Sequence, residues 1–447
     1  MTRLNRIEML ILNDILRSPS HGKDGARKRK PPVFLTGLFL AFLLLFNAFY
    51  AKAQDAQFTH RTEALQFIQN GDNLMSFANW QDALFAYDNA IALDPTFATA
   101  YMKKANLLAK IGRRQEAVKL YDKAIQLNPY SEYVYDSRAK LKMLAMDYKG
   151  ALTDLDKAMS INPDERIRDH KVDDLIAMKA YEQALSEIDT LIDADYKVAY
   201  ELERKALVQM IMDSIEECEE TINQLLVLKP NSALAHDILG LIRLNENQYP
   251  KALEHFTKAI ELDENFAIAY YNRGVAFRYL NNNEAAMNDF NRAIEIRQNL
   301  AQFYFTRALV SKAEGEMDNA LEDYDKALLL NDNFEAAFYN RAYTLKILGE
   351  YTSALVDIDE FLFTDPDSPM AWNLKGNAHT LQSDYLKAID SYTQAIISNP
   401  DYAEACYNRG LVNLMSNRSP AGCEDLELAE RLGYNRAALK LQAFCGF

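Results

Sequence analysis

The sequence predicts an all-α fold, a solenoid built from antiparallel helix hairpins that stack side by side. Three observations lead to this prediction. The sequence resembles itself at a spacing of 34 residues, small residues recur at two fixed places in each repeat, and glycine and proline are scarce, at 15 and 12 of 447 residues. A repeat of this length holds two helices and their turns, and such a chain grows by stacking rather than by adding globular domains.

The first 53 residues have the pattern of an export signal. A basic cluster at 27–30 precedes an apolar run over 33–50, and the triplet Ala51-Lys52-Ala53 follows. These are the three parts of a secretory signal peptide, with cleavage expected after Ala53. The apolar run, at about 18 residues, equally permits an uncleaved membrane anchor. Both interpretations place the repeats outside the cytoplasm, so we expect a periplasmic or secreted protein or, with the anchor kept, a membrane-anchored one.

After a short linker over 54–63, the repeats run from 64 to 436 and form eleven units. Prolines at 95, 129 and 163 mark the end of the first three units, because proline stops a helix. A small residue lies in the first helix of every unit except the fourth: Gly71, Ala105, Ala139, Ala206, Gly240, Gly274, Ala308, Ala342, Gly376 and Gly410. Another small residue follows twelve positions later in every unit, so the two helices of each hairpin can approach closely.

These offsets resemble the tetratricopeptide repeat, in which an early aromatic residue, two small residues, a second aromatic residue, an alanine and a proline recur in that order. The early aromatic positions are Phe67, Tyr101, Tyr135, Tyr270, Tyr304, Phe338 and Trp372. The resemblance implies a right-handed superhelical solenoid whose first helices line the inner surface and bind an extended peptide or a helix of a partner. Residues 437–447 are expected to form a C-terminal capping helix.

The fourth unit departs from the pattern. It is one residue short, it begins with the polar run 168–171, and Asp173 stands where glycine or alanine is expected to make the helix contact. Either this unit is an ordinary degenerate repeat, or it introduces a bend that separates three regular repeats from a C-terminal block.

The resemblance also implies a candidate binding groove in the C-terminal block. Positions five and six of the first helices carry aromatic and asparagine side chains there: Tyr271, Asn272, Phe305, Tyr339, Asn340, Tyr407 and Asn408. Amides that both donate and accept suit a peptide backbone. The alternative is structural, with the arginines that follow at position seven pairing with acids on a neighbouring helix. The carboxylate clamp of some family members is not matched, since Met102 stands where that clamp needs lysine.

The charge and the missing motifs exclude other functions. The net charge is −15, but the first 53 residues hold nine basic residues against three acids, so the rest of the chain carries −21. Such a surface repels phosphate backbones, and we expect no nucleic-acid partner. The six histidines are scattered without metal-ligand spacing, no phosphate-binding loop or nucleophile motif occurs, and the repeats leave no length for a catalytic domain. We therefore expect no cofactor, no metal, no enzymatic activity, and contact with membrane only through the N-terminal segment.

Cys423 lies near the start of the last second helix, and Cys445 lies near the end of the cap. Both are about equally far from the turn at Gly433, so antiparallel helices bring them together, and an exported protein permits their oxidation to a disulfide. Taken together, the sequence predicts an exported, non-catalytic scaffold that binds a protein or peptide in a bacterial cell envelope. Recognition of a cell-wall glycan, or a role as accessory subunit of an envelope enzyme, are the alternatives.

Overall fold

The structure is a computed structural model that describes residues 42–446, with side chains described from residue 59 onward. The predicted export signal thus lies almost wholly outside the described residues: of its segment only the helical backbone from 42 is described, as the beginning of α2 (Phe42–Ser76). Within the described range, no helix is both long enough and apolar enough to cross a bilayer. The choice between a cleaved signal and an anchor stays a prediction.

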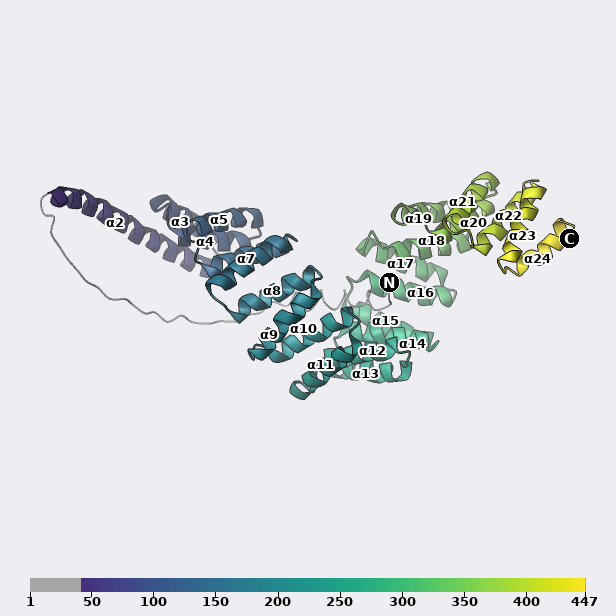
Figure 1. Cartoon of the computed structure of the whole chain (residues 1–447), viewed down its shortest axis with the longest axis horizontal. Helices are drawn as coiled ribbons and strands as arrows, with labels where there is room; N and C mark the ends of the chain where they lie inside the picture. Colours follow the sequence, from purple (N-terminus) through teal and green to yellow (C-terminus); the bar gives the residue numbers. More distant parts are fainter. Residues whose placement is uncertain (1–41, 447) are drawn as a thin grey trace. The chain divides into compact units, whose positions relative to one another are not determined.

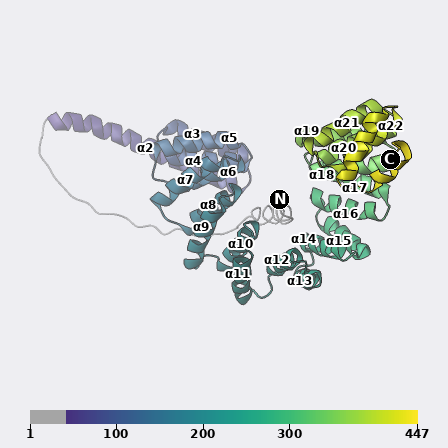
Figure 2. The same ribbon diagram turned by 45° about the vertical axis from the view of Figure 1, so that its right-hand side comes forward.

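The described chain is all-helical and divides into two compact units, the N-terminal unit up to Pro230 and the C-terminal unit from Asn231. In both units, hairpins follow one another in sequence order (Figures 1 and 2). Five hairpins form the N-terminal unit, in which α2 pairs with the first of the following helices: α3 (Trp80–Leu93), α4 (Ala98–Lys110), α5 (Arg114–Leu127), α6 (Glu132–Leu144), α7 (Tyr148–Ile161), α8 (Glu165–Ala177), α9 (Tyr181–Asp193), α10 (Val198–Ile211) and α11 (Ile215–Leu228).

Six hairpins and a final single helix form the C-terminal unit. Its helices are α12 (Ala233–Asn245), α13 (Tyr249–Leu262), α14 (Ala267–Tyr279), α15 (Asn283–Ile296), α16 (Ala301–Ala313), α17 (Met317–Leu330), α18 (Glu335–Leu348), α19 (Tyr351–Thr364), α20 (Pro369–Leu381), α21 (Tyr385–Ser398), α22 (Ala403–Met415), α23 (Ser419–Arg431) and α24 (Arg436–Phe444). The predicted all-α class with stacked hairpins is confirmed. The boundary between the two compact units falls after the fifth hairpin, not at the fourth.

The small residues let the two helices of a hairpin touch through a large side chain. A Cβ added to Gly240 would lie 2.4 Å from the ring of Phe256, which is fully buried sixteen residues later. Gly376 faces the buried ring of Tyr392 in the same way, with 2.5 Å to a hypothetical Cβ. Because no side-chain atom fits in these gaps, only glycine allows the helices to pack at this distance around an aromatic ring.

The fourth hairpin keeps the same contact through a different residue from the one expected. Val172, not Asp173, is fully buried against Ala184 and lies twelve residues before it, the spacing found in the other hairpins. The missing residue belongs to the turn before α8, which has three residues (162–164) where the turn before α6 has four (128–131). The shorter turn shifts the register of the helix by one position, so Asp173 points elsewhere.

First helices lie on the inner side of the stack within each unit. In the C-terminal unit, α12 contacts α14, α18 contacts α20 and α20 contacts α22, and the N-terminal unit shows the same pattern from α2 to α8. Second helices make no comparable contact with one another in the part of the chain that the structure describes. A row of hairpins whose first helices touch and whose second helices diverge presents its first helices on the inner face.

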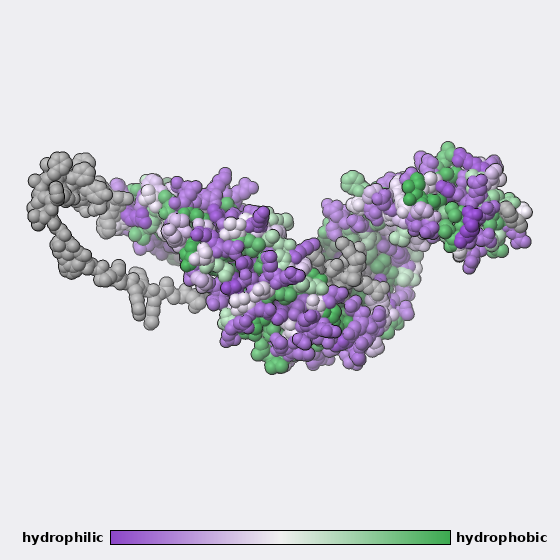
Figure 3. All heavy atoms as spheres, in the orientation of Figure 1, coloured by the Kyte–Doolittle hydropathy of each residue, from purple (hydrophilic) through white to green (hydrophobic). Residues whose placement is uncertain are grey.

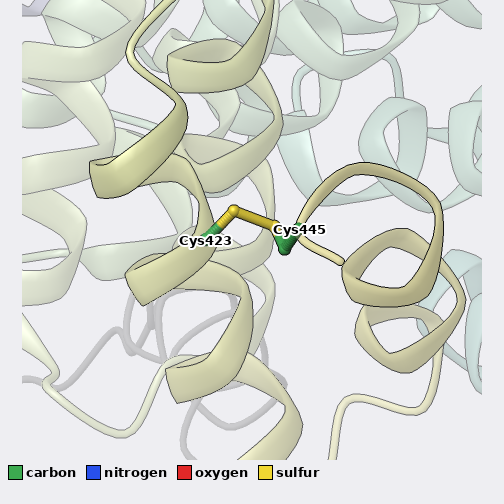
Figure 4. The surroundings of a disulfide bond; sticks show 2 residues. All are labelled: Cys423 and Cys445. Carbon is green, nitrogen blue, oxygen red and sulfur yellow. A yellow bond between two sulfur atoms is a disulfide. The ribbon is translucent and has the colours of Figure 1, made fainter. Parts of the chain in front are cut away.

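The C-terminal cap is fixed covalently. Helix α24 packs on α23, and a disulfide joins Cys423 to Cys445 with 5.8 Å between their Cα atoms (Figure 4). Closing a loop of this length stabilises the folded end by about 3 kcal/mol through the unfolded chain's lost entropy. The remaining cysteines, Cys218 and Cys406, are reduced and buried.

Candidate functional site

The structure corrects the expected groove at four of its seven positions, because those side chains are buried between hairpins. Tyr271 is 3% exposed, stacks on Phe303 with ring centroids 5.0 Å apart, and shares a hydrogen bond of 3.1 Å with Thr306. Phe305 and Tyr407 are also buried, and each packs against an aromatic residue in the turn that follows its own hairpin. Tyr271, Phe305 and Tyr407 at position five are therefore buried within the stack, whereas Tyr339 at the same position is half-buried.

The asparagines at position six mostly bridge neighbouring first helices. Fully buried Asn272 donates to both carboxylate oxygens of Asp237, at 3.0 and 3.1 Å. Burial raises the pKa of Asp237 to about 7. Asn408, which is partly exposed, donates to Asn373 at 3.0 Å and to Asn377 at 3.2 Å. Their amide protons are already used within the chain, so a peptide backbone would have to displace these bonds.

The arginines at position seven pair with acids, as the structural alternative predicts. Arg341 donates through Nε and Nη2 to both oxygens of Asp357, sixteen residues later, at 2.8 and 2.6 Å. Its Nη1 donates to Asp325 of the preceding hairpin at 2.6 Å. Four further arginines likewise donate both to an aspartate of their own hairpin and to a side chain of the preceding hairpin: Arg138, Arg273, Arg307 and Arg409. Bidentate pairs of this kind fix the geometry of a hairpin and join it to the previous one.

A group of accessible residues on the inner face lies on α16 and α18. Tyr343 is 39% exposed, and the Nζ atoms of Lys312 and Lys346 lie 5.4 and 4.3 Å from the centre of its ring. Lys312 also donates to Asn340 Oδ1 at 2.7 Å, while Asn340 donates to a backbone oxygen of its own helix. Tyr339 is half-buried beside them. We call Asn340, Tyr343, Lys312 and Lys346 the lysine–tyrosine cluster.

Most of this cluster was not predicted from the sequence, because a repeat pattern does not show which side chains are exposed. One signal was available, however: position twelve of the first helix is basic in three consecutive hairpins, at Arg278, Lys312 and Lys346. Repeats at fixed spacing place such residues in a row on one face of the stack.

The N-terminal unit contains a cluster of buried charges between α8 and α10. The guanidinium of Arg204 is 1% exposed and donates to Asp169 and Asp173, each at 2.6 Å, with Glu201 at 3.3 Å. Lys197 completes this cluster through a 2.7 Å contact to Asp169. Asp174, which is 1% exposed, has neither oxygen hydrogen-bonded, and burial raises its pKa to about 7. The ion pairs of Arg204 and Lys197 hold α8 to α10, and these two cations are already used within the chain.

A second feature of the surface is a row of exposed apolar side chains on second helices. Leu329, Phe363 and Ile397 occupy equivalent positions at the ends of α17, α19 and α21, and Phe363 is 86% exposed. The surface of the described residues is otherwise largely hydrophilic, with hydrophobic residues scattered over it (Figure 3). Among the side chains that are described, no group of three His, Cys, Asp or Glu residues is arranged to hold a metal ion.

Comparisons with known proteins agree with this architecture. Profiles described as tetratricopeptide repeat match residues 68–132, 267–300, 301–334, 339–402 and 382–433, and a profile described as TPR repeat matches 240–278. Together these matches cover more than half of the chain. The third to fifth hairpins, which contain the shortened turn and the buried ions, fall outside the matched ranges.

Several solved structures with similar folds are distant in sequence. The hetero-tetramer Cut9–Hcn1 matches with a TM-score of 0.45 and 11% identity over 82% of this chain and 95% of that chain. PilF of Pseudomonas aeruginosa matches with a TM-score of 0.42 and 15% identity over 47% and 97%. Yeast Tom70 matches with a TM-score of 0.36 and 16% identity over 85% and 95%.

No curated protein matches the sequence. The profile matches and the stacked hairpins nevertheless agree on one assignment. The chain belongs to the tetratricopeptide repeat family, whose members are non-catalytic scaffolds that bind proteins or peptides.

Proposed function

We propose that this protein is an exported scaffold of a bacterial cell envelope and that it holds a protein partner on the inner face of its C-terminal unit. The observation that carries the choice of face is the lysine–tyrosine cluster, which combines accessible aromatic area with two cations. Tyrosine is a side chain that often dominates the binding energy of interfaces. The inner face of the N-terminal unit, in contrast, pairs its own charges.

Two features support export. The basic cluster, apolar run and Ala51-Lys52-Ala53 exit form a secretory pattern. The disulfide between Cys423 and Cys445 fits an oxidising compartment, because cytosolic thiols are kept reduced. The N-terminal pattern and the C-terminal disulfide therefore support the proposal of export independently of each other.

The alternative function, recognition of a cell-wall glycan, loses the observation that mainly supported it. It depended on rows of exposed aromatic rings, and Tyr271, Phe305 and Tyr407 are buried between hairpins. A sugar needs an open ring face on which to stack, and the accessible rings of Tyr343 and its half-buried neighbour Tyr339 do not form such a row.

Export is tested by cell fractionation together with mass spectrometry of the mature N-terminus and a thiol count. We expect the protein in the envelope fraction, with two free thiols. A peptide beginning at Gln54 would establish cleavage, whereas an intact apolar run in the membrane fraction would establish the anchor. Recovery from the cytosol with four free thiols would refute export.

Binding of a partner is tested separately, by crosslinking in intact cells followed by purification of the protein from envelope extracts. We expect at least one protein to be recovered repeatedly and to be lost from cells that lack this chain. If repeated crosslinking returned no protein, the scaffold function would be withdrawn.

A further inference from the structure

Three consecutive first helices of the C-terminal unit carry a row of basic side chains. Arg278, Lys312 and Lys346 occupy position twelve of α14, α16 and α18 and are 34 residues apart. All three are partly exposed on the inner side of the stack. We call them the basic row.

No member of the basic row has a salt-bridge partner among the described side chains, although the charge of Glu404 acts on Lys346. The position-seven arginines of the same helices, in contrast, are all neutralised by aspartates. Helices α14 and α16 contain no acid, and α18 contains only Glu335 at its start. In a chain whose remainder carries −21, the basic row places three cations at one repeat position of consecutive first helices, and this charge is complementary to an anionic occupant.

The surroundings of the two lysines are already partly dehydrated. Burial lowers the pKa of Lys312 and also that of Lys346, which Glu404 offsets in part. They are the two lysines with a lowered pKa in the part of the chain whose side chains are described. A carboxylate brought by a partner would form charge-assisted hydrogen bonds with ammonium groups that have already lost much of their water.

Resting on the proposed scaffold function, we propose that the basic row binds an extended, acidic peptide segment of the partner. We take the spacing of packed helices, about 8–10 Å, for successive members of the row, and an extended chain advances about 3.3 Å per residue. Carboxylates three residues apart in the peptide therefore match successive members of the row. The ring of Tyr343 packs against the segment between two such carboxylates, and the row shares no position with the carboxylate clamp considered from the sequence.

Selection from a display library of random dodecapeptides tests this on the full mature chain. We expect peptides with Asp or Glu at a spacing of three, and their enrichment should vanish when Arg278, Lys312 and Lys346 are all changed to Gln. A control with the same loss of charge changes exposed lysines of second helices, Lys251, Lys258 and Lys387, to Gln and should retain the selected peptides. Circular dichroism and thermal melting establish that both variants are folded.

The affinity of the best selected peptide then gives the size of the effect. Each lost pair is expected to weaken binding by about tenfold, measured by fluorescence anisotropy. Amidating the C-terminus of the peptide, or changing its internal Asp and Glu to Asn and Gln, separates a terminal carboxylate from side-chain carboxylates; we expect the side chains to matter. Neutral or basic selected peptides, or equal binding by the Gln variant, would overturn the proposal while leaving the envelope partner of the scaffold function in place.

Discussion

The two compact units build the same hairpin but handle charge differently. In the C-terminal unit, four of the six hairpins carry an arginine that grips an aspartate bidentately on its own second helix, and these ions lie partly at the surface. In the N-terminal unit only Arg138 does so, while Arg204 and Glu201 are buried in the core. Ion pairs join neighbouring hairpins in both units, as in Lys103–Asp72 and Arg341–Asp325, whereas the N-terminal unit also buries an arginine and a glutamate in its core.

The difference has consequences for both stability and binding. A buried cluster depends on every member, since removal of one ion leaves the others unpaired in a medium of low dielectric. The arginines that pair with aspartates in the C-terminal unit are partly exposed although the aspartates are buried, so water reaches a lost partner there more easily than around Arg204. The C-terminal unit also has three cations on its inner face that form no salt bridge with a described side chain. In the N-terminal unit, Asp136, Asp169 and Asp173 are paired with His170, Lys197 and Arg204.

The largest effect is expected from Arg204→Met. This change leaves Asp169, Asp173 and Glu201 without their central cation and should destabilise the N-terminal unit by about 3–5 kcal/mol. Hydrogen exchange resolved by peptide should show lost protection in α8 and α10 and unchanged protection from α14 to α22. The neighbouring Lys205→Met, which removes a pair with half-exposed Asp189, serves as control and should cost less than about 1 kcal/mol. Equal effects of the two changes would contradict a central role for the buried cluster.

The next largest effect is a pH dependence of stability that is caused by Asp174. Its pKa in the folded state, about 7, exceeds the ordinary value of 3.8, so the folded state binds the proton more tightly. Stability therefore falls as pH rises from about 4 to about 7, by about 1.4 kcal/mol per pH unit. Urea unfolding of the N-terminal unit at pH 5 and pH 7 should differ by about 2 kcal/mol from this group, because Asp174 is already half ionised at pH 7. Asp174→Asn should remove that part of the difference; an unchanged slope would mean that Asp174 is ionised throughout.

The disulfide gives an effect of similar size that is confined to the C-terminal end. Changing Cys423 and Cys445 together to Ser should lower the stability of α23 and α24 by about 3 kcal/mol. Proteolysis should then cut first near Gly433, in the turn between these helices. A double variant as resistant to protease as the wild type would show that packing of Leu441 and Ala437, both buried, is sufficient to hold the cap.

The smallest effect is expected from Arg341→Lys. Lysine keeps the charge but cannot form the bidentate pair with Asp357 and reach Asp325 at the same time. We expect a loss of about 1 kcal/mol in denaturant unfolding of the C-terminal unit, against no measurable change for Lys375→Arg, which occupies the equivalent position of the next hairpin. A loss as large as that of Arg204→Met would remove the distinction between the two units.

Much of the fold was predictable because the repeat pattern is a packing pattern. A small residue followed sixteen positions later by a large apolar one, as at Gly240 and Phe256, recurs because the two helices of a hairpin touch there. The number and order of the hairpins can therefore be predicted from the sequence. The helix contact of the fourth unit was wrongly assigned to Asp173. The sequence shows that this unit is one residue short but not where the residue is missing, and the burial of Val172 places the change of register before it.

The binding face was predicted less well. An aromatic residue at position five is equally compatible with a groove and with a contact to the next hairpin, and the ring of Tyr271 turns out to pack on Phe303. Arg273 and Lys312 are both basic residues on first helices, yet only the first meets an aspartate, Asp289. Whether a charge has a partner depends on residues sixteen positions away or in other hairpins, which the local pattern does not reveal.

The most direct test of the central claim is site-specific photocrosslinking in cells. A benzoylphenylalanine replaces Tyr343 on the inner face in one variant and Phe363, in the exposed apolar row of the second helices, in another. We predict a discrete protein adduct from position 343 and none from position 363. An adduct from position 363 alone, or none from either position, would contradict the assignment of the inner face of the C-terminal unit as the partner-binding surface.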